Sequence, residues 1–372
     1  MARRAARLAV VALAAAACSL QSSAATPSPS SPLPRGALLA VLEPGSFSQV
    51  AYAHESVALI GASGRAVARQ TFAARSVPRV ALAAPVMAPE AQVAAGRVWF
   101  VDGGGSVRSL DAAGKVVEVT RFPLDSPQKM LSFAVSGDGG RLMAAEFTWS
   151  PPATGPGAAD QPLAYDVYSA APAAAAVLVA HHEWSQGPTP QLAQPVLQLV
   201  GWAKAAPLAV VDTALPGTQE TLPEPFSGPL VEVAATGSPG VEIGGSDCNA
   251  VSVLPDETVL CYDPASGSAS VRSKAGRRLF ELTGTPLANV EGTALAPDGR
   301  HAALGSVVLG QDGHRLQLPP AFQPEGWVDA ATVVGVQFTD QGESNLELIR
   351  LSQPGNVVDA GVKGTYVGTL TA

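Results

Sequence analysis

The chain has 372 residues, of which 47% are hydrophobic and 15% are charged, and it contains 37 Gly and 32 Pro. The hydrophobic content excludes a disordered chain, and the length is sufficient for a substantial buried core. The many Gly and Pro residues favour tight turns over long helices. The net charge of −8 argues against nucleic acid as a partner, because phosphate binding needs an excess of clustered Lys and Arg.

The N-terminal segment has the layout of an export signal. Arg3, Arg4 and Arg7 precede an apolar run from Leu8 to Ala17, which is too short to span a membrane as a mature helix. Small residues then lead to a cysteine. We therefore expect a signal peptide over residues 1–17 and an extracytoplasmic protein.

The stretch Ala14–Cys18, AAAAC, resembles a bacterial lipobox, a motif whose cysteine becomes the lipidated first residue of the mature protein. The resemblance implies lipidation of Cys18 and a membrane-anchored protein of the cell envelope. The sequence departs from the usual motif at Ala15, where lipoboxes commonly have Leu. Ordinary cleavage after Ser23-Ala24-Ala25, which would give a secreted protein, and a twin-arginine signal are the alternatives.

Residues 18–36 are rich in Ser, Pro and Ala and contain no apolar periodicity. Such a segment cannot bury enough surface to offset the entropy of ordering it. We expect a tether over residues 18–36 that carries one folded domain over residues 37–372.

Short alternating runs separated by Gly, Pro, Asp and Asn follow the tether. Arg97–Phe122 is typical of three strands joined by tight turns, and Ser252–Leu282 repeats this plan. Gly201–Val211 and Gly326–Val336 both begin with Gly-Trp, and Ser150–Pro162 is expected to be a surface loop between two strands. Short strands at regular spacing indicate a sandwich, a barrel or a propeller, and the self-similarity favours the propeller.

Two turns in the chain are near-copies of each other. FAVSGDGGRLMAA (Phe133–Ala145) is followed about 160 residues later by ALAPDGRHAAL (Ala294–Leu304). The Gly after each Asp suits a positive φ, and the Asp side chain can accept a hydrogen bond from a backbone N–H of the turn. Each turn resembles the S-P-D-G stretch that joins the innermost strand of a blade to the next strand in TolB-type and WD-repeat-like β-propellers.

This resemblance implies an all-β propeller over residues 37–372. Repeats of about 40–45 residues favour seven blades, and the length is compatible with six to eight. We expect the ring to close by pairing of Leu38–Leu42 with the last blade, because a propeller must cover its first and last sheet edges. Val357–Leu370 is expected to supply the inner strands of that blade.

Three cysteines, Cys18, Cys248 and Cys261, leave an even pair if the first is lipidated. An exported protein lies in an oxidising compartment, so we expect a disulfide between Cys248 and Cys261, with two free thiols as the alternative. The simplest hairpin, with its turn at Pro255-Asp256, places Cys261 opposite Ala250 and the sulfurs on a diagonal about 7–8 Å long. A bulge would bring the two cysteines closer.

Candidate catalytic or ligand-binding residues are few. In HHEW (His181–Trp184) a strand would place His181 and Glu183 on one side, but a metal site would need a third ligand from another blade. The tryptophans could stack against a sugar, although packing between blades is the more common role; the four considered are Trp149, Trp184, Trp202 and Trp327. No cofactor or metal is expected.

The sequence favours a non-catalytic binding or scaffold protein, expected to be a monomer, with an unidentified protein or carbohydrate as its ligand. The alternative is a hydrolase or lyase whose residues come one per blade to the central channel and therefore leave no linear motif. Two carboxylates, or a His and a carboxylate, at the channel mouth would favour the enzyme.

Overall fold

The computed structural model describes residues 33–45, 47–48, 51–52, 54–74, 91–126, 129–148, 162–185, 194–204, 206–214, 229–263, 266, 268–282, 293–339 and 342–371. The chain divides into two units, Met1–Ser31 and Pro32–Ala372. The first unit lies outside the described residues, as do Cys18 and most of the expected tether, and all the strands belong to the second.

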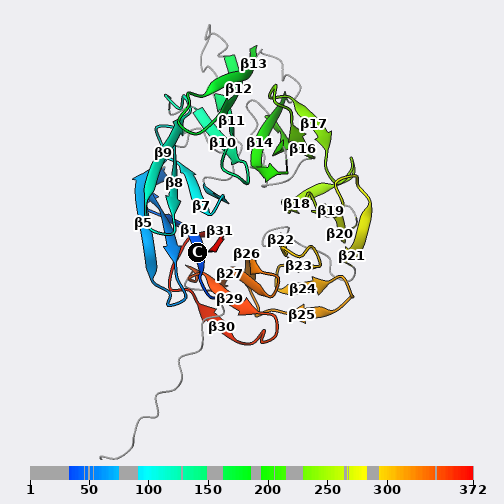
Figure 1. Ribbon diagram of the computed structural model, residues 1–372. Helices are drawn as coiled ribbons and strands as arrows, with labels where there is room; N and C mark the ends of the chain where they lie inside the picture. Colours follow the sequence, from blue (N-terminus) through cyan, green and yellow to red (C-terminus); the bar gives the residue numbers. More distant parts are fainter. Residues whose placement is uncertain are drawn as a thin grey trace, which may run out of the picture. The chain divides into compact units, whose positions relative to one another are not determined.

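Seven antiparallel sheets follow one another and form the blades of a β-propeller (Figure 1). Blades one to four, each from its innermost strand outward, are β31 (Thr365–Thr371), β1 (Ala37–Pro44), β4 (His54–Ile60) and β5 (Ala66–Ala73); β6 (Ala91–Ala94), β7 (Arg97–Val101), β8 (Ser106–Asp111) and β9 (Val116–Arg121); β10 (Lys129–Val135), β11 (Leu142–Thr148), β12 (Pro162–Ala170) and β13 (Val177–Ser185); and β14 (Gln194–Ala203), β15 (Ala206–Ala214), β16 (Leu230–Val233) and β17 (Pro239–Glu242).

Blades five to seven, in the same order, are β18 (Asn249–Val253), β19 (Val259–Asp263), β20 (Ser268–Arg272) and β21 (Arg278–Leu282); β22 (Thr293–Leu295), β23 (His301–Leu304), β24 (Val307–Gly310) and β25 (Arg315–Gln317); and β26 (Phe322–Asp329), β27 (Thr332–Thr339), β29 (Glu347–Arg350) and β30 (Val357–Asp359). Three two-residue strands complete the set: β2 (Phe47–Ser48) pairs with β3 (Ala51–Tyr52), and β28 (Gly342–Glu343) pairs with β27. The expected seven blades are confirmed.

The core is divided among the interfaces between blades. Each of the seven interfaces holds one cluster of buried apolar side chains contributed by both neighbouring blades. Because second strands such as β11 and third strands such as β24 are covered on both faces, they read as nearly continuous apolar runs. The described residues include no helix with the length and apolar character needed to cross a bilayer.

The repeated turns occupy equivalent places, as expected. Ser136–Arg141 joins β10 to β11, and Ala296–Arg300 joins β22 to β23. In both turns the Gly has positive φ, 70° at Gly139 and 65° at Gly299, and the preceding Asp accepts a hydrogen bond from a backbone N–H two residues further on. The two Gly-Trp segments are likewise equivalent, since each runs from the innermost strand of a blade into the second, in blades four and seven.

The ring closes through the two ends of the domain. The expected pairing of the N-terminal strand is confirmed, because β1 pairs with β31 from Ala37↔Thr371 to Leu42↔Thr365 and with β4 on its other side. The expectation that Val357–Leu370 supplies two inner strands is wrong. Only β31 does so, whereas β30 pairs with β29 as the outermost strand of blade seven. The two runs were expected to share a sheet because they are adjacent in sequence, but a blade boundary separates them.

A close contact supports the closure between blades seven and one. The hydroxyl of Tyr366 on β31 donates to the carbonyl of Trp327 on β26 at 2.8 Å, and its backbone N–H donates to Glu325 Oε2 at 2.6 Å. Gly326 lies against the same ring, and a Cβ there would come within 2.5 Å of Tyr366 Cε1. This glycine therefore makes room for the ring that joins the ends of the domain.

We predict that Gly326→Ala lowers the free energy of unfolding by about 1–3 kcal/mol, because the added methyl group forces the Tyr366 ring away. Gly355→Ala is the matched control, since nothing lies within 4 Å of the Cβ it would add. Denaturant unfolding followed by tryptophan fluorescence measures both variants. Equal effects of the two substitutions would contradict the prediction.

Candidate functional site

Polar groups on the innermost strands are used to join neighbouring blades. Hydrogen bonds between a side chain of one innermost strand and the backbone of the next occur at five of the seven interfaces. The pairs are Gln92 Nε2 to Phe133 O, Leu199 N to Ser132 Oγ, Leu295 N to Ser252 Oγ, Trp327 Nε1 to Ala294 O, and Tyr366 N to Glu325 Oε2. Polar residues on innermost strands are candidates for a site at the central channel, but these residues align the blades by bonding to the neighbouring backbone.

Acidic and basic residues are rare on these seven strands. Within their described residues they are Lys129, Glu325 and Asp329. Lys129 pairs with carboxylates, Glu325 accepts the N–H of Tyr366, and Asp329 Oδ1 accepts the N–H of Ala331. The three residues lie on two strands and each is already engaged, so they do not form the convergent set expected of an enzyme acting at the channel.

A polar row crosses blade three instead. Glu146 on β11 lies directly opposite Asp166 on β12, which lies directly opposite His181 on β13. Directly opposed residues share a face of the sheet. Leu142 and Ala144, on the same face as Glu146, pack in the apolar cluster between blades two and three. The row therefore lies at that interface and away from the central axis.

Glu146 is the unusual member of this row, because its side chain is fully buried. The ammonium of Lys129 lies 2.9 Å from Oε1 as an ion pair, and no other described group donates to either oxygen of Glu146. Burial raises the pKa of Glu146 to about 7, although Lys129 favours its charged form. A second carboxylate, Asp125, lies 2.8 Å from the same ammonium.

Asp166 and His181 form the outer part of the row. Asp166 Oδ1 lies 2.6 Å from His181 Nδ1, and this hydrogen bond raises the pKa of the imidazole. Burial raises the pKa of the neighbouring Tyr168 hydroxyl to about 12, and the hydroxyl lies 3.5 Å from Asp166 Oδ2. The Glu146 carboxyl at the inner end of the row is closed to solvent, and the partly exposed Asp166 carboxylate is hydrogen-bonded to His181.

The side-chain directions expected for HHEW are confirmed in part. His181 Nε2 lies 3.7 Å from Glu183 Oε2 on one side of β13, while the ring of His182 stacks 6.2 Å from that of Tyr165 on the other. Besides Glu183, the partner of His181 is Asp166, which belongs to the same blade and not to another one. Among the described residues no group of three His, Cys, Asp or Glu could hold a metal ion.

Of the four tryptophans considered, the structure describes the side chains of Trp202 and Trp327, and these two do not form a common stacking surface. Trp327 is buried between blades six and seven and donates to Ala294 O. Trp202 is half-buried in blade four with the guanidinium of Arg141 over its ring at 5.1 Å. Trp149 and the side chain of Trp184 lie outside the described part of the chain. The two described indoles have the packing role.

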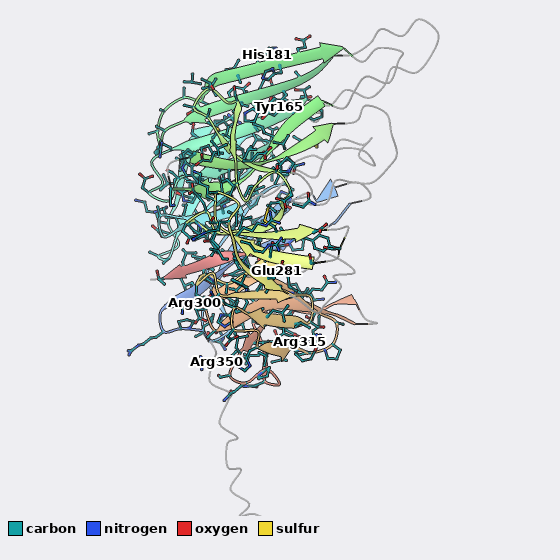
Figure 2. The ribbon with its side chains drawn as sticks, turned by 90° about the vertical axis from the view of Figure 1, so that its right-hand side faces the viewer. Tyr165, His181, Glu281, Arg300, Arg315 and Arg350 are labelled. Atoms are coloured by element: carbon teal, nitrogen blue, oxygen red, sulfur yellow. A yellow bond between two sulfur atoms is a disulfide. The ribbon has the colours of Figure 1, made fainter. Side chains whose placement is uncertain are left out.

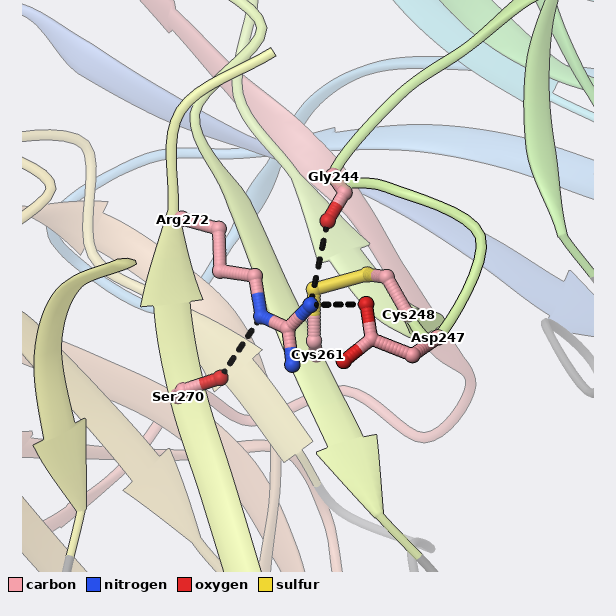
Figure 3. Close-up of a disulfide and its surroundings, with 6 residues drawn as sticks. All are labelled: Gly244, Asp247, Cys248, Cys261, Ser270 and Arg272. Atoms are coloured by element: carbon pink, nitrogen blue, oxygen red, sulfur yellow. Dashed lines mark hydrogen bonds and ion pairs between the residues drawn. A yellow bond between two sulfur atoms is a disulfide. The ribbon is translucent and has the colours of Figure 1, made fainter. Parts of the chain in front are cut away.

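Cys248 and Cys261 form a disulfide within the apolar cluster between blades four and five (Figure 3). Cys261 lies opposite Ala250 as expected, but the Cα atoms of the two cysteines are 5.0 Å apart and not on a wide diagonal. The expected diagonal is wrong because Cys248 precedes β18 in a turn, where its N–H donates to Gly245 O.

The surroundings of the disulfide are held by Arg272. Its guanidinium donates to Ser270 Oγ, to Gly244 O and to Asp247 Oδ1, the last at 2.6 Å (Figure 3). These bonds fix the chain segment that leads into Cys248. Chain-entropy arguments give the disulfide about 3 kcal/mol of stabilisation for a loop of this length.

A group of ion-paired side chains joins blades four and five. Lys274 Nζ contacts Glu232 at 2.5 Å and Glu257 at 3.0 Å, and Lys204 reaches the other oxygen of Glu257 at 3.1 Å. Burial opposes ionisation of Glu257, but the two lysines hold its pKa below the usual value. A shallow hollow of about 660 Å³ borders this group, between β17 and Lys274. Since each of these charges is paired, the group is best explained as a link between blades four and five.

Sequence reasoning missed the blade-three row. Its signal was a single Glu within the apolar run LMAAEFT, a strand that is otherwise almost fully buried. A charge in such a run indicates a buried partner, which here is Lys129. The partner could not be named from the sequence, because Lys129 lies 17 residues away at the start of another strand.

No family model matches this sequence, and no curated protein matches it. Similar solved structures include oligogalacturonate lyase from Vibrio parahaemolyticus, with a TM-score of 0.46, 8% identity and coverage of 83% of this chain and 90% of that one. BamB from Moraxella catarrhalis has a TM-score of 0.40 and 13% identity, with coverage of 84% of this chain and 82% of that one. Sqt1 from Saccharomyces cerevisiae has a TM-score of 0.44 and 10% identity, with coverage of 88% of this chain and 87% of that one. The seven-bladed architecture itself rests on the strand pairing described above.

We predict that Glu146→Gln reduces the pH dependence of stability. The folded pKa of Glu146, about 7, lies above its ordinary value of 4.5, so the native state holds this proton more tightly than the unfolded state. Its stabilising contribution is complete below about pH 4.5 and is lost as the pH rises through 7. Gln does not titrate, so the variant should lose less stability than the wild type between pH 5 and pH 8.

Thermal unfolding at several pH values measures this difference. Glu242→Gln, at an exposed position on β17, is the control and should follow the wild type. Parallel pH profiles for Glu146→Gln and wild type would refute the assignment of a raised pKa to this carboxyl.

Proposed function

We propose that this chain is an exported β-propeller, anchored through a lipid on Cys18, that acts as a non-catalytic binding or scaffold protein of the cell envelope. The anchor is supported by the N-terminal pattern of three Arg, an apolar run and AAAAC. The TolB-type and WD-repeat-like resemblance of the turns at Asp138 and Asp298 belongs to the same proposal, with a protein or carbohydrate as the ligand.

One observation carries the non-catalytic assignment. The polar side chains of the innermost strands bind the backbone of the neighbouring blade at five interfaces, so they are engaged in aligning the blades. An enzyme acting at the channel needs some of those groups to be directed toward a substrate. The disulfide between Cys248 and Cys261 is consistent with an oxidising compartment.

A hydrolase or lyase is the second candidate, and the row of Glu146, Asp166 and His181 is the observation in its favour. It combines two carboxylates and an imidazole, and its partly exposed members, Asp166 and His181, are groups of the kind used in acid–base catalysis. This would place the chemistry at the interface of blades two and three and not at the central channel.

We predict that Cys18→Ser moves the protein from the membrane fraction to the soluble extracytoplasmic fraction, because the lipid is attached through the thiol. Fractionation, together with the mass of the mature N-terminal peptide, measures the change. Ser19→Ala is the matched control and should stay with the membrane. A Cys18→Ser variant that remains membrane-bound, with no lipid mass on the wild type, would exclude the anchor.

We predict that Glu146→Gln leaves binding intact. In-cell cross-linking of the wild type should give discrete adducts with envelope components, and the variant should give the same adducts at similar yield. A binding propeller does not need a titrating group in blade three, whereas an enzyme that uses this row does. Loss of the adducts in a variant with an unchanged melting temperature would favour the enzyme.

A further inference from the structure

The strand order gives the propeller two different sides. Neighbouring strands in each blade are antiparallel, so the turns from the first to the second strand and from the third to the outermost strand lie at the same ends of the strands. We call this end of the blades the turn side. The repeated turns Ser136–Arg141 and Ala296–Arg300 both belong to it.

The chain enters the domain at the turn side. Residues 33–36 lead directly into Ala37, the first residue of β1, which pairs with Thr371 near the end of the chain. Cys18 lies only 15 residues before Leu33. Even fully extended, that segment reaches about 50 Å. A lipid on Cys18 would therefore keep the point of entry within about that distance of the bilayer.

Exposed basic side chains occur at the turn side of every blade. Ten Arg and Lys residues in the turns, or directly beside them, are exposed. They are Arg35 and Arg65 in blade one, Lys115 in blade two, Arg141 in blade three, Lys204 in blade four, Arg277 and Arg278 in blade five, Arg300 and Arg315 in blade six, and Arg350 in blade seven. Several of these residues are labelled in Figure 2.

Carboxylates on this side are fewer, and most are engaged. Six are exposed among the described residues near these turns, and Glu242 is one of them. The other five accept hydrogen bonds from a turn N–H or from Arg272; they are Asp138, Asp247, Asp256, Asp298 and Asp312. These hydrogen bonds leave the carboxylates charged, and two of the ten basic residues are paired, Lys204 with Glu257 and Arg278 with Glu281. The exposed side chains of the turn side therefore carry a small excess of positive charge, although the whole chain has a net charge of −8.

The same side has an apolar rim. The large apolar side chains that are exposed in the described part of the molecule all lie on the outermost strands of blades one to five, within three residues of the strand's first residue. They are Val67, Val117, Val177, Leu178, Val241 and Leu279. Each follows the turn that leads into its strand. Basic side chains beside exposed Val and Leu are the composition of surfaces that lie at a lipid headgroup layer.

We propose that the turn side of this propeller lies against an anionic phospholipid surface, with its Arg and Lys side chains among the lipid phosphates and its apolar rim at the headgroups. The proposal uses the Cys18 anchor of the proposed function for its orientation. The charge and the rim are properties of the folded domain, so they can be tested without the anchor. Attraction of Lys and Arg to anionic lipid acts within a Debye length, about 10 Å at 0.1 M salt.

The test uses the exported chain carrying Cys18→Ser, which has no anchor, and sedimentation with vesicles. Vesicles of equal phosphatidylglycerol and phosphatidylcholine should bind the protein at least tenfold more tightly than phosphatidylcholine alone, and 1 M salt should abolish the difference. The triple variant Arg65→Glu, Lys115→Glu and Arg277→Glu should lose at least tenfold of this binding. These three side chains form no ion pair within the described residues.

A second triple variant separates the surface from the net charge. Arg108→Glu, Arg121→Glu and Lys363→Glu change the charge equally but lie nearer the other end of the blades, so binding should fall less than threefold. Melting temperatures check that both variants fold. Equal losses in the two triple variants, equal binding to neutral vesicles, or binding to heparin without binding to vesicles would overturn the proposal. Lipid on Cys18 is read separately by mass, so failure of the anchor and failure of this surface are distinguishable.

Discussion

Each blade of this protein has to bury both of its faces, and no blade can do so alone. The apolar side chains of one blade are covered only by those of the next, so seven clusters form at seven interfaces and the last interface exists only if the ring closes. Closure is therefore the constraint on which the rest depends. It is met by pairing the first strand with the last, and by Tyr366, which connects β31 to β26 beside a glycine that leaves room for its ring.

Burial of both faces also explains which parts of the fold could be read from the sequence. Turns with Gly at positive φ, such as those at Gly139 and Gly299, are local signals and were located correctly. The assignment of Val357–Asp359 to the closing blade failed because strand propensity does not say where one sheet ends and the next begins. Register is similarly non-local. Cys248 comes close to Cys261 through a turn that Arg272 stabilises from another strand.

The candidate site was harder to predict than the fold, for a physical reason. Glu146 is alone in an apolar run, and its meaning depends on Lys129 and Asp166, which two other strands place beside it. A buried carboxylate and the ammonium that pairs with it can lie at any separation in the sequence, so no linear motif identifies them. Conversely, the His-rich stretch at His181 drew attention as a motif, yet its histidine is accounted for by carboxylate partners in the same blade.

The difference in charge between the two sides of the ring is the feature that is hardest to predict from the sequence. Charges are unevenly spread along the chain, since thirteen Asp and Glu residues but only one basic residue, Lys204, lie between Arg141 and Arg272. In each antiparallel blade every second turn returns to the same side of the ring, so residues that are far apart in the sequence lie on one side. Basic residues such as Arg65 and Arg300 follow tight turns on that side, where exposed basic residues outnumber exposed carboxylates, and Asp125 lies toward the other side. A chain of net charge −8 can thus present a basic surface where its N-terminal segment enters, and attraction to anionic lipid depends on that local field more than on the total charge.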